Sequence, residues 1–334
     1  SVTGLVTGPG VRLVAGFWPL RQPPVAPTPT GPTPTPTTGP ATASPVVTVT
    51  STPPGTPGGP GVWTVNTTSD ADDGTCDSAH CSLREALTQT IWHDAPDTIR
   101  FAIPTGDPGC DASGVCTILP AMRLPELVDG QTTIDGFTQA GTRANTAPFG
   151  QPIDAVLRIV LDGSALPEAD RYASGVDVRS SDNLIRGLVI HDFNTGIEVS
   201  DATGNRIEGC FIGTDATGLA APGNRCIGVS VAGFEGGAGS ARNVVGGASP
   251  AARNLISGNG CNGVSIGPSG DNDVQGNYIG TDATGGRALP NDVGGVRAYF
   301  SAGNRIGGAG DGAANLVAFN ETAGVIVSQH TAPA

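Results

Sequence analysis

The chain has 334 residues, of which 51 are Gly and 28 are Pro, and its formal net charge is −13. All 17 basic residues are Arg, and no basic run of the kind that binds nucleic acid or an anionic membrane surface occurs. No stretch approaches the roughly 18 apolar residues that a membrane-spanning helix needs. We therefore expect no nucleic-acid partner and no membrane insertion.

Residues 1–20 form the first of three predicted regions and contain an apolar stretch between Val11 and Leu20. Apolar and aromatic residues of this kind favour pairing with another strand, so the stretch is a candidate self-assembly segment. Its candidate contact residues are Val11, Leu13, Val14, Phe17, Trp18 and Leu20.

Pro and Thr dominate the second predicted region, residues 21–61. This composition cannot bury a core and favours extended polyproline II, which acts as a semi-rigid spacer. Thr and Pro tracts are also typical substrates of dense O-glycosylation, and an unmodified linker is the alternative. The candidate glycosylated residues are Thr28, Thr30, Thr33, Thr35 and Thr37.

The third predicted region, residues 62–334, opens with a strand at residues 62–66 and an acidic loop at residues 70–77. A capping box from Ser82 to Glu85 then predicts the start of a short helix. This helix would cover the open end of the first coil with one apolar face, formed by Leu83, Ala86, Leu87 and Ile91. Further strands are expected at residues 98–103, 117–119 and 132–134, whereas residues 137–182 show no regular pattern.

A repeated heptapeptide determines the expected architecture. Ile-Gly-Thr-Asp-Ala-Thr-Gly occurs at residues 212–218 and again at residues 279–285. Short Asn-x-Ile or Asn-x-Val segments recur around both copies, bounded by turn-forming residues and without room for a crossover helix. Stacked coils of roughly 20–30 residues, a parallel β-solenoid, follow from this pattern. A propeller or a Greek-key sandwich is the alternative, but each normally needs longer strands and more aromatic residues.

Equivalent residues of a solenoid line up in columns about 4.8 Å apart. Asn205 and Asn272 are predicted to share one corner column, with inward apolar side chains at Ile207, Ile212, Val274, Ile279 and Ile306. Asp215 and Asp282 recur at equivalent corners, where we interpret them as turn residues whose carboxylates cap backbone amides. A catalytic pair would be unique and not periodic, and calcium binding is the other alternative.

The chain has seven Cys, and two close pairs predict local disulfides, Cys76 with Cys81 and Cys110 with Cys116. Disulfides indicate an oxidising compartment; a four-cysteine zinc site is the alternative, although CxxC spacing is missing. The repeat also aligns residues 224–229 with residues 259–264. Because aligned residues of neighbouring coils lie within disulfide range, we predict a third bond between Cys226 and Cys261. Cys210 is then expected to remain a free, buried thiol. Two reduced thiols in a stacked column remain the alternative for that third pair.

The segment Cys81-Ser82-Leu83-Arg84-Glu85-Ala86 resembles the "CSLREA" motif that opens many bacterial secreted right-handed parallel β-helix proteins. Ile-Gly-Thr-Asp-x-x-Gly repeats recur in the same group, and the resemblance covers roughly residues 62–328. It implies an all-β, right-handed parallel β-helix with a short N-terminal capping helix, and an exported protein located outside the cell or at its surface. Function is left open, because the group includes adhesins and surface-layer components.

No catalytic constellation is recognisable. The Gly-His-Gly and Arg-x-Lys strings of β-helix galacturonan hydrolases have no equivalent, and the second is impossible without Lys. The histidines lack partners at metal-binding spacing: His80, His93, His191 and His330. We expect no catalytic residue, no metal ligand and no cofactor, with calcium at the acidic loop as the alternative.

These observations favour a structural role, as a self-assembling subunit of an extracellular filament, sheath or surface appendage. No amphipathic helix follows the predicted last strand, residues 324–328, so its coil is expected to be open. A spacer of about forty residues in polyproline II could carry residues 11–20 over 100 Å to a neighbouring copy of the chain. The alternatives are a carbohydrate-active or glycan-binding β-helix, and a surface adhesin domain on a glycosylated stalk.

Overall fold

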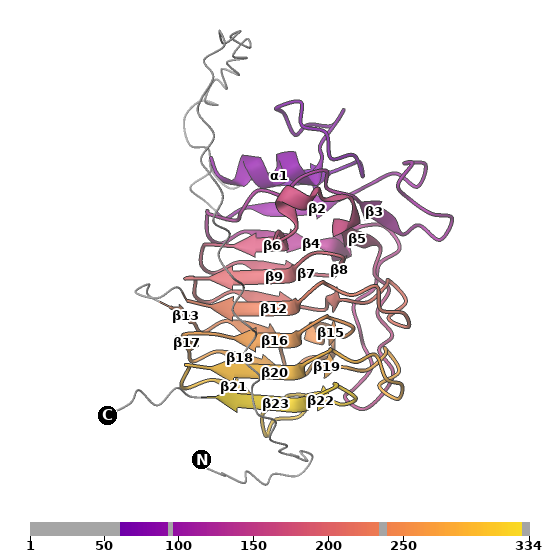
Figure 1. The fold of residues 1–334 in the computed structure, drawn as a ribbon. Helices are drawn as coiled ribbons and strands as arrows, with labels where there is room; N and C mark the ends of the chain where they lie inside the picture. The colour runs from indigo at the N-terminus through magenta and orange to yellow at the C-terminus, as the bar shows by residue number, and fades with distance from the viewer. Residues whose placement is uncertain (1–60, 93–95, 234–238, 329–334) are drawn as a thin grey trace, which may run out of the picture. The chain divides into compact units, whose positions relative to one another are not determined.

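The computed structural model describes residues 61–92, 96–233 and 239–328 (Figure 1). Within these ranges the regular structure is almost entirely β, with 23 short strands in four sheets, all of them parallel, and one α-helix. The all-β class and the parallel pairing that the repeats predicted are therefore confirmed.

Three long sheets hold most of the strands, and a small fourth sheet holds two. The first sheet contains β1 (Val62–Val65), β2 (Thr98–Phe101), β4 (Thr133–Asp135), β7 (Leu184–Arg186), β10 (Arg206–Glu208), β14 (Val244–Gly246), β18 (Asp273–Gln275) and β21 (Arg305–Ile306). The second contains β3 (Cys116–Ile118), β5 (Ile159–Asp162), β8 (Leu188–His191), β11 (Phe211–Ile212), β15 (Leu255–Ile256), β19 (Tyr278–Ile279) and β22 (Leu316–Val317). The third contains β6 (Ser174–Val178), β9 (Thr195–Ser200), β12 (Ile227–Ala232), β16 (Asn262–Ile266), β20 (Gly294–Tyr299) and β23 (Ala323–Ser328), and the fourth contains β13 (Ser240–Ala241) and β17 (Ser269–Gly270).

The chain visits the three long sheets in turn. From β10 in the first sheet it passes to β11 in the second and β12 in the third, and then returns to the first at β14. Each strand therefore pairs with the strand from the next turn, as Figure 1 shows for β9, β12, β16, β20 and β23. This arrangement is a solenoid-like stack of coils.

Columns of apolar side chains form the core. The column of the first sheet runs through Ile99, Ile134, Ile185, Ile207, Val245, Val274 and Ile306. Four of the five predicted inward residues are fully buried, and Ile306, on the last strand of the first sheet, is partly buried against the same core. β-branched side chains suit these short strands because their stiff χ1 packs well on a pleated surface.

Ladders of buried asparagine side chains line the corners between the sheets. The Asn205 side-chain amide donates to Oδ1 of Asn243 at 3.1 Å, and Asn243 donates in the same way to Asn272 at 3.0 Å. The predicted column of Asn205 and Asn272 is therefore present, but the 67-residue interval of the heptapeptide spans two coils. Two further ladders run through Asn224, Asn259, Asn291 and Asn320, and through Asn254, Asn277 and Asn315.

One α-helix, α1 (Leu83–Thr90), lies at the end of the stack where β1 and β2 lie (Figure 1). Its residues Leu83, Ala86 and Leu87 are buried, as the amphipathic pattern predicted. The prediction was wrong for Ile91, whose side chain is 38% exposed. The helix ends at Thr90, and Ile91 is the C-cap, so it no longer follows the helical face.

Short 3-10 turns follow several strands, and their bounds are η1 (Gly136–Thr138), η2 (Gly163–Ala165), η3 (Glu168–Asp170) and η4 (Pro250–Ala252). In η1 and η2 the residue directly before the turn caps its first free amide. Asp135 accepts from the amide of Phe137, and Asp162 accepts from the amide of Ser164. Short acidic side chains hold such turns because they cap free amides.

Residues 143–156, which we call the strap, lie within the part of the sequence that showed no regular pattern. An antiparallel bridge between Arg143 and Val156 closes the base of the strap. Its far end reaches later coils, because the Tyr278 hydroxyl donates to the carbonyl of Gln151 at 2.8 Å. The strap residues Ile153 and Ala155 pack against outward apolar side chains of the second sheet. These side chains are Val160, Val189, Phe211, Leu255 and Tyr278.

Candidate functional site

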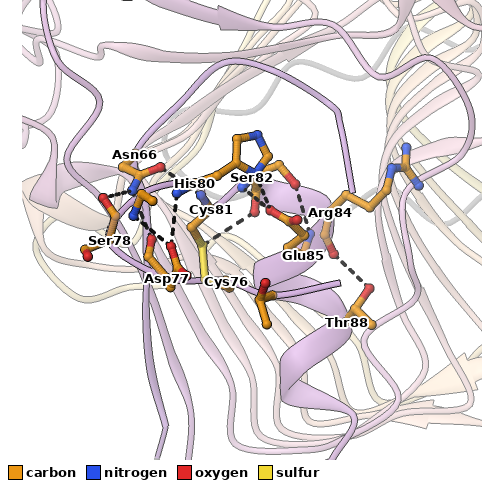
Figure 2. Close-up of a disulfide and its surroundings, with 12 residues drawn as sticks. Asn66, Cys76, Asp77, Ser78, His80, Cys81, Ser82, Arg84, Glu85 and Thr88 are labelled. Atoms are coloured by element: carbon orange, nitrogen blue, oxygen red, sulfur yellow. Dashed lines mark hydrogen bonds and ion pairs between the residues drawn. A yellow bond between two sulfur atoms is a disulfide. The ribbon is translucent and has the colours of Figure 1, made fainter. Parts of the chain in front are cut away.

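The segment that resembles the CSLREA motif forms the start of α1 and the end of a disulfide loop (Figure 2). Cys81 is bonded to Cys76. The Ser82 hydroxyl accepts from the amide of Glu85 at 3.1 Å, and Oε2 of Glu85 accepts from the amide of Ser82 at 2.8 Å. The predicted capping box is therefore present, and it satisfies amides that the helix itself cannot.

Arg84 has a structural role in the same segment. It is buried and forms an ion pair with Asp70, with 2.7 Å between Nη2 and Oδ2. The same guanidinium donates to the carbonyls of Met122 and Arg123, each at 2.9 Å. Asp70 also accepts from the amide of Ala121 at 2.8 Å. The carboxylate of Asp70, the first aspartate of the acidic loop, is thus already bound by Arg84 and by a backbone amide. This weakens the alternative that the loop binds calcium.

A histidine and two carboxylates meet beside this capping box, and sequence reasoning missed them. Nδ1 of His80 lies 3.0 Å from Oε2 of Glu85 and 4.0 Å from Oδ2 of Asp73. Their spacings in sequence, seven and five residues, match no common metal motif. The Cys76–Cys81 disulfide folds the loop back onto the helix start, which brings the three side chains together. The disulfide next to the histidine was the only available signal.

A second cluster contains His191 and Asp162 on the second sheet, together with Asp192, which directly follows β8. Nδ1 of His191 lies 2.8 Å from Oδ2 of Asp192, in hydrogen-bond geometry, and 3.9 Å from Oδ1 of Asp162. Here the imidazole nitrogen already has a protein partner. The other two histidines, His93 and His330, lie outside the described residues.

The cysteines are paired as the sequence predicted. Disulfides join Cys76 to Cys81, Cys110 to Cys116, and Cys226 to Cys261, and Cys210 is free and buried. Burial raises the pKa of the Cys210 thiol to about 12, so this thiol is protonated and unreactive at neutral pH. Three disulfides indicate folding in an oxidising environment.

The repeated aspartates cap their own loops. Oδ1 of Asp215 accepts from the amides of Leu219 at 3.1 Å and Ala220 at 3.2 Å. Oδ1 of Asp282 accepts from the amides of Thr284 at 3.1 Å and Arg287 at 3.2 Å. The two side chains hold equivalent turns in different coils, which is the turn role expected from their periodicity.

The outer face of the first sheet carries a shallow groove of about 670 Å³ near its beginning. Its polar side chains are those of Thr64, Thr98, Arg100, Thr133, Asp135, Thr138 and Arg186. Arg186 pairs with Asp135, with 2.6 Å between Nη2 and Oδ2. Arg100 is exposed. The groove therefore presents both donors and acceptors to a polar ligand.

The predicted self-assembly residues between Val11 and Leu20, and the candidate glycosylated residues between Thr28 and Thr37, lie outside the described residues. None of the helices in the described ranges is long and apolar enough to cross a membrane. In comparisons with known proteins, the sequence matches no family model and no curated protein.

Proposed function

We propose that this chain is an exported right-handed parallel β-helix that serves as a structural subunit of an extracellular filament, sheath or surface appendage. The handedness and the export are what the CSLREA resemblance implies. Three long parallel sheets visited in turn support the solenoid architecture, and three disulfides support folding in an oxidising compartment.

The observation that carries this proposal is a core column whose last member within the described residues is exposed. On the third sheet, inward side chains align through Val178, Val199, Val231, Ile266, Ala298 and Val327. Ala298 is 7% exposed and the earlier members are fully buried, but Val327 is 69% exposed. A residue that occupies a core position and still faces solvent is a docking position for another coil or strand.

The other sheets end in the same way within the described residues. Ile306 and Val317 are only partly buried, and each of β21, β22 and β23 pairs with a strand on one side. Unpaired parallel edges with apolar side chains favour strand addition. The proposed occupant is a second copy of the chain, contributing residues 11–20 or its first coil. A contact of this type between different surfaces propagates into a fibre.

Sedimentation velocity and electron microscopy of the purified chain test this proposal. We expect concentration-dependent end-to-end oligomers, and we expect Val327→Lys to abolish them because it places a charge in the docking position. Leu219→Lys is the matched control, since Leu219 is also exposed but lies in a loop. Deletion of residues 1–20 tests whether the arm is the connector.

A wild-type chain that stays monomeric at every concentration would contradict the proposal. Oligomers that persist unchanged in Val327→Lys would show that another surface holds the copies together. Loss of oligomers in Val327→Lys but not in the deletion variant would assign the contact to the first coil and not to the arm.

A glycan-binding role is the second candidate, and the groove on the first sheet favours it. Threonine hydroxyls and the charged groups of Arg100, Asp135 and Arg186 suit the hydroxyl and carboxyl groups of an acidic glycan. Arg100→Ala should then weaken binding in a glycan array, whereas Arg242→Ala, at an exposed arginine outside the groove, should not. Equal binding by both variants would exclude the groove.

A further inference from the structure

We propose that Asp73, His80 and Glu85 bind one Zn²⁺ ion between the acidic loop and the start of α1. The three donor atoms lie within 4.8 Å of one another. Two ligands on a tetrahedral zinc ion with bonds of about 2.0–2.1 Å are roughly 3.3 Å apart. The separations of 3.0 Å from His80 to Glu85 and 4.0 Å from His80 to Asp73 lie on either side of that distance.

The Nδ1 atom of His80 lies beside both carboxylates and makes no hydrogen bond. Nδ1 of His80 is buried from solvent and has no hydrogen-bond partner, so its 3.0 Å approach to Glu85 lacks hydrogen-bond geometry. A buried nitrogen that makes no hydrogen bond is costly, and a metal ion would satisfy it. His80 therefore differs from His191, whose Nδ1 is hydrogen-bonded to Asp192.

Glu85 is the most firmly held of the three ligands. Its side chain is 1% exposed, Oε2 accepts from the amide of Ser82 at 2.8 Å, and Oε1 accepts from the amide of Asp73 at 2.7 Å. Each carboxylate oxygen has a second acceptor site, so these bonds leave one acceptor site on each oxygen for a cation. Arg84, the adjacent cation, is committed to Asp70 and does not offset the charge of Glu85.

The loop holds the other two ligands in place. The Cys76–Cys81 bond closes the loop next to His80, and Oδ1 of Asp77 accepts from the amides of Ala79 at 2.7 Å and His80 at 3.2 Å. Oδ1 of Asp73 accepts from the amide of Thr75 at 3.0 Å, which leaves Oδ2 directed to His80. A ligand set fixed before binding loses little conformational entropy when the ion arrives.

The donor chemistry selects the class of metal. One imidazole nitrogen and two carboxylates form a mixed nitrogen and oxygen set, which suits Zn²⁺ with water completing the coordination. Ca²⁺ requires six to eight oxygen ligands, and this cluster does not supply them. The bound ion would link residues 73–80 to α1 and so fasten the covering helix to the loop before it.

Isothermal titration of the untagged full chain with ZnCl₂ tests the proposal. We expect one ion per chain, with affinity reduced at least tenfold in His80→Gln and in Asp73→Asn. Asp72→Asn is the matched control, because this neighbouring aspartate is exposed and outside the cluster. Zn²⁺ should raise the melting temperature of the wild type and of Asp72→Asn but not of His80→Gln.

Asp73 is exposed, so Asp73→Asn keeps the test decisive even if His80→Gln folds poorly. The proposal is overturned if the wild type does not bind Zn²⁺, or if both ligand variants bind it with wild-type affinity. Binding that is lost only in His191→Gln would place the ion at the second cluster and overturn the assignment. Ca²⁺ binding that equals Zn²⁺ binding would also refute it.

Discussion

The side-chain amide of Asn205 donates to Oδ1 of Asn243 across 38 residues of sequence, and the backbone amide of Asn205 donates to the same oxygen at 2.9 Å. Asn243 therefore satisfies two buried donors of the neighbouring coil while its own side chain donates to the next asparagine. A single side chain thus connects three coils.

Asn243→Ala should lower the free energy of unfolding by about 3 kcal/mol, because it leaves buried donors of Asn205 without an acceptor. Asn304→Ala is the control: Asn304 accepts from Asn272 at the end of the same ladder, but it is partly exposed, so water can replace it. We expect a loss of about 1 kcal/mol there. Denaturant titration of both variants checks this, and equal losses would contradict the ladder argument.

Removing the disulfide between coils should cost more than removing a local one. Cys226 and Cys261 are 35 residues apart, whereas Cys110 and Cys116 are six apart. Loop-closure entropy predicts about 4 kcal/mol for the double alanine variant of the first pair and about 2 kcal/mol for that of the second. Thermal and denaturant unfolding measure the difference. A larger loss at Cys110 and Cys116 would contradict it.

Arg253→Met should release the strap. Arg253 is buried, donates to the carbonyl of Ala147 at 2.8 Å and to that of Gly276 at 3.2 Å, and lies 5.0 Å from the ring centroid of Tyr278. Its loss leaves these carbonyls unpaired and should cost about 2–4 kcal/mol. Hydrogen exchange should rise in residues 143–156 first. Arg242→Met, at an exposed arginine, should change neither quantity.

Acid should weaken the contact of Asp107 with residues 67 and 68. Burial raises the pKa of this carboxyl, but hydrogen bonds from Thr68, Gly109 and Thr67 outweigh it and hold the pKa below 3.8. Because the folded-state pKa is the lower one, this stabilisation is complete above about pH 5, well above the unfolded-state pKa, and is lost as the pH falls through the folded-state pKa. Asp107→Asn should be less stable than the wild type at pH 7, and the difference in stability should shrink as the pH falls below about 4. A stability difference that did not change with pH would contradict this.

The repeats made most of the stack predictable. Similar sequence neighbours surround Asn205 and Asn272, and likewise Ile207 and Val274. A residue that recurs with the period of the repeat has the same surroundings in each coil. The capping box and the close cysteine pairs are local signals, so they too were readable from the sequence. Cys226 with Cys261 followed from aligning two repeats.

The strap and the cluster around His80 could not be predicted, because each depends on contacts that have no period. Residues 143–156 share no motif with the coils they cover, and Tyr278 carries no sign that it will contact Gln151. Glu85 was correctly predicted as a capping residue, but its approach to His80 arises only when the disulfide loop closes.

The strap also bears on how the protein unfolds. In a stack of coils that contact only their neighbours, stability is a sum of nearest-neighbour terms, and either end can fray alone. Asn145 donates to the carbonyl of Pro250, and Ile153 donates to that of Ala283, so the strap joins early and late coils directly. Late coils cannot separate without breaking contacts made by an early segment. Melting should therefore be more all-or-none than a chain of independent repeats allows.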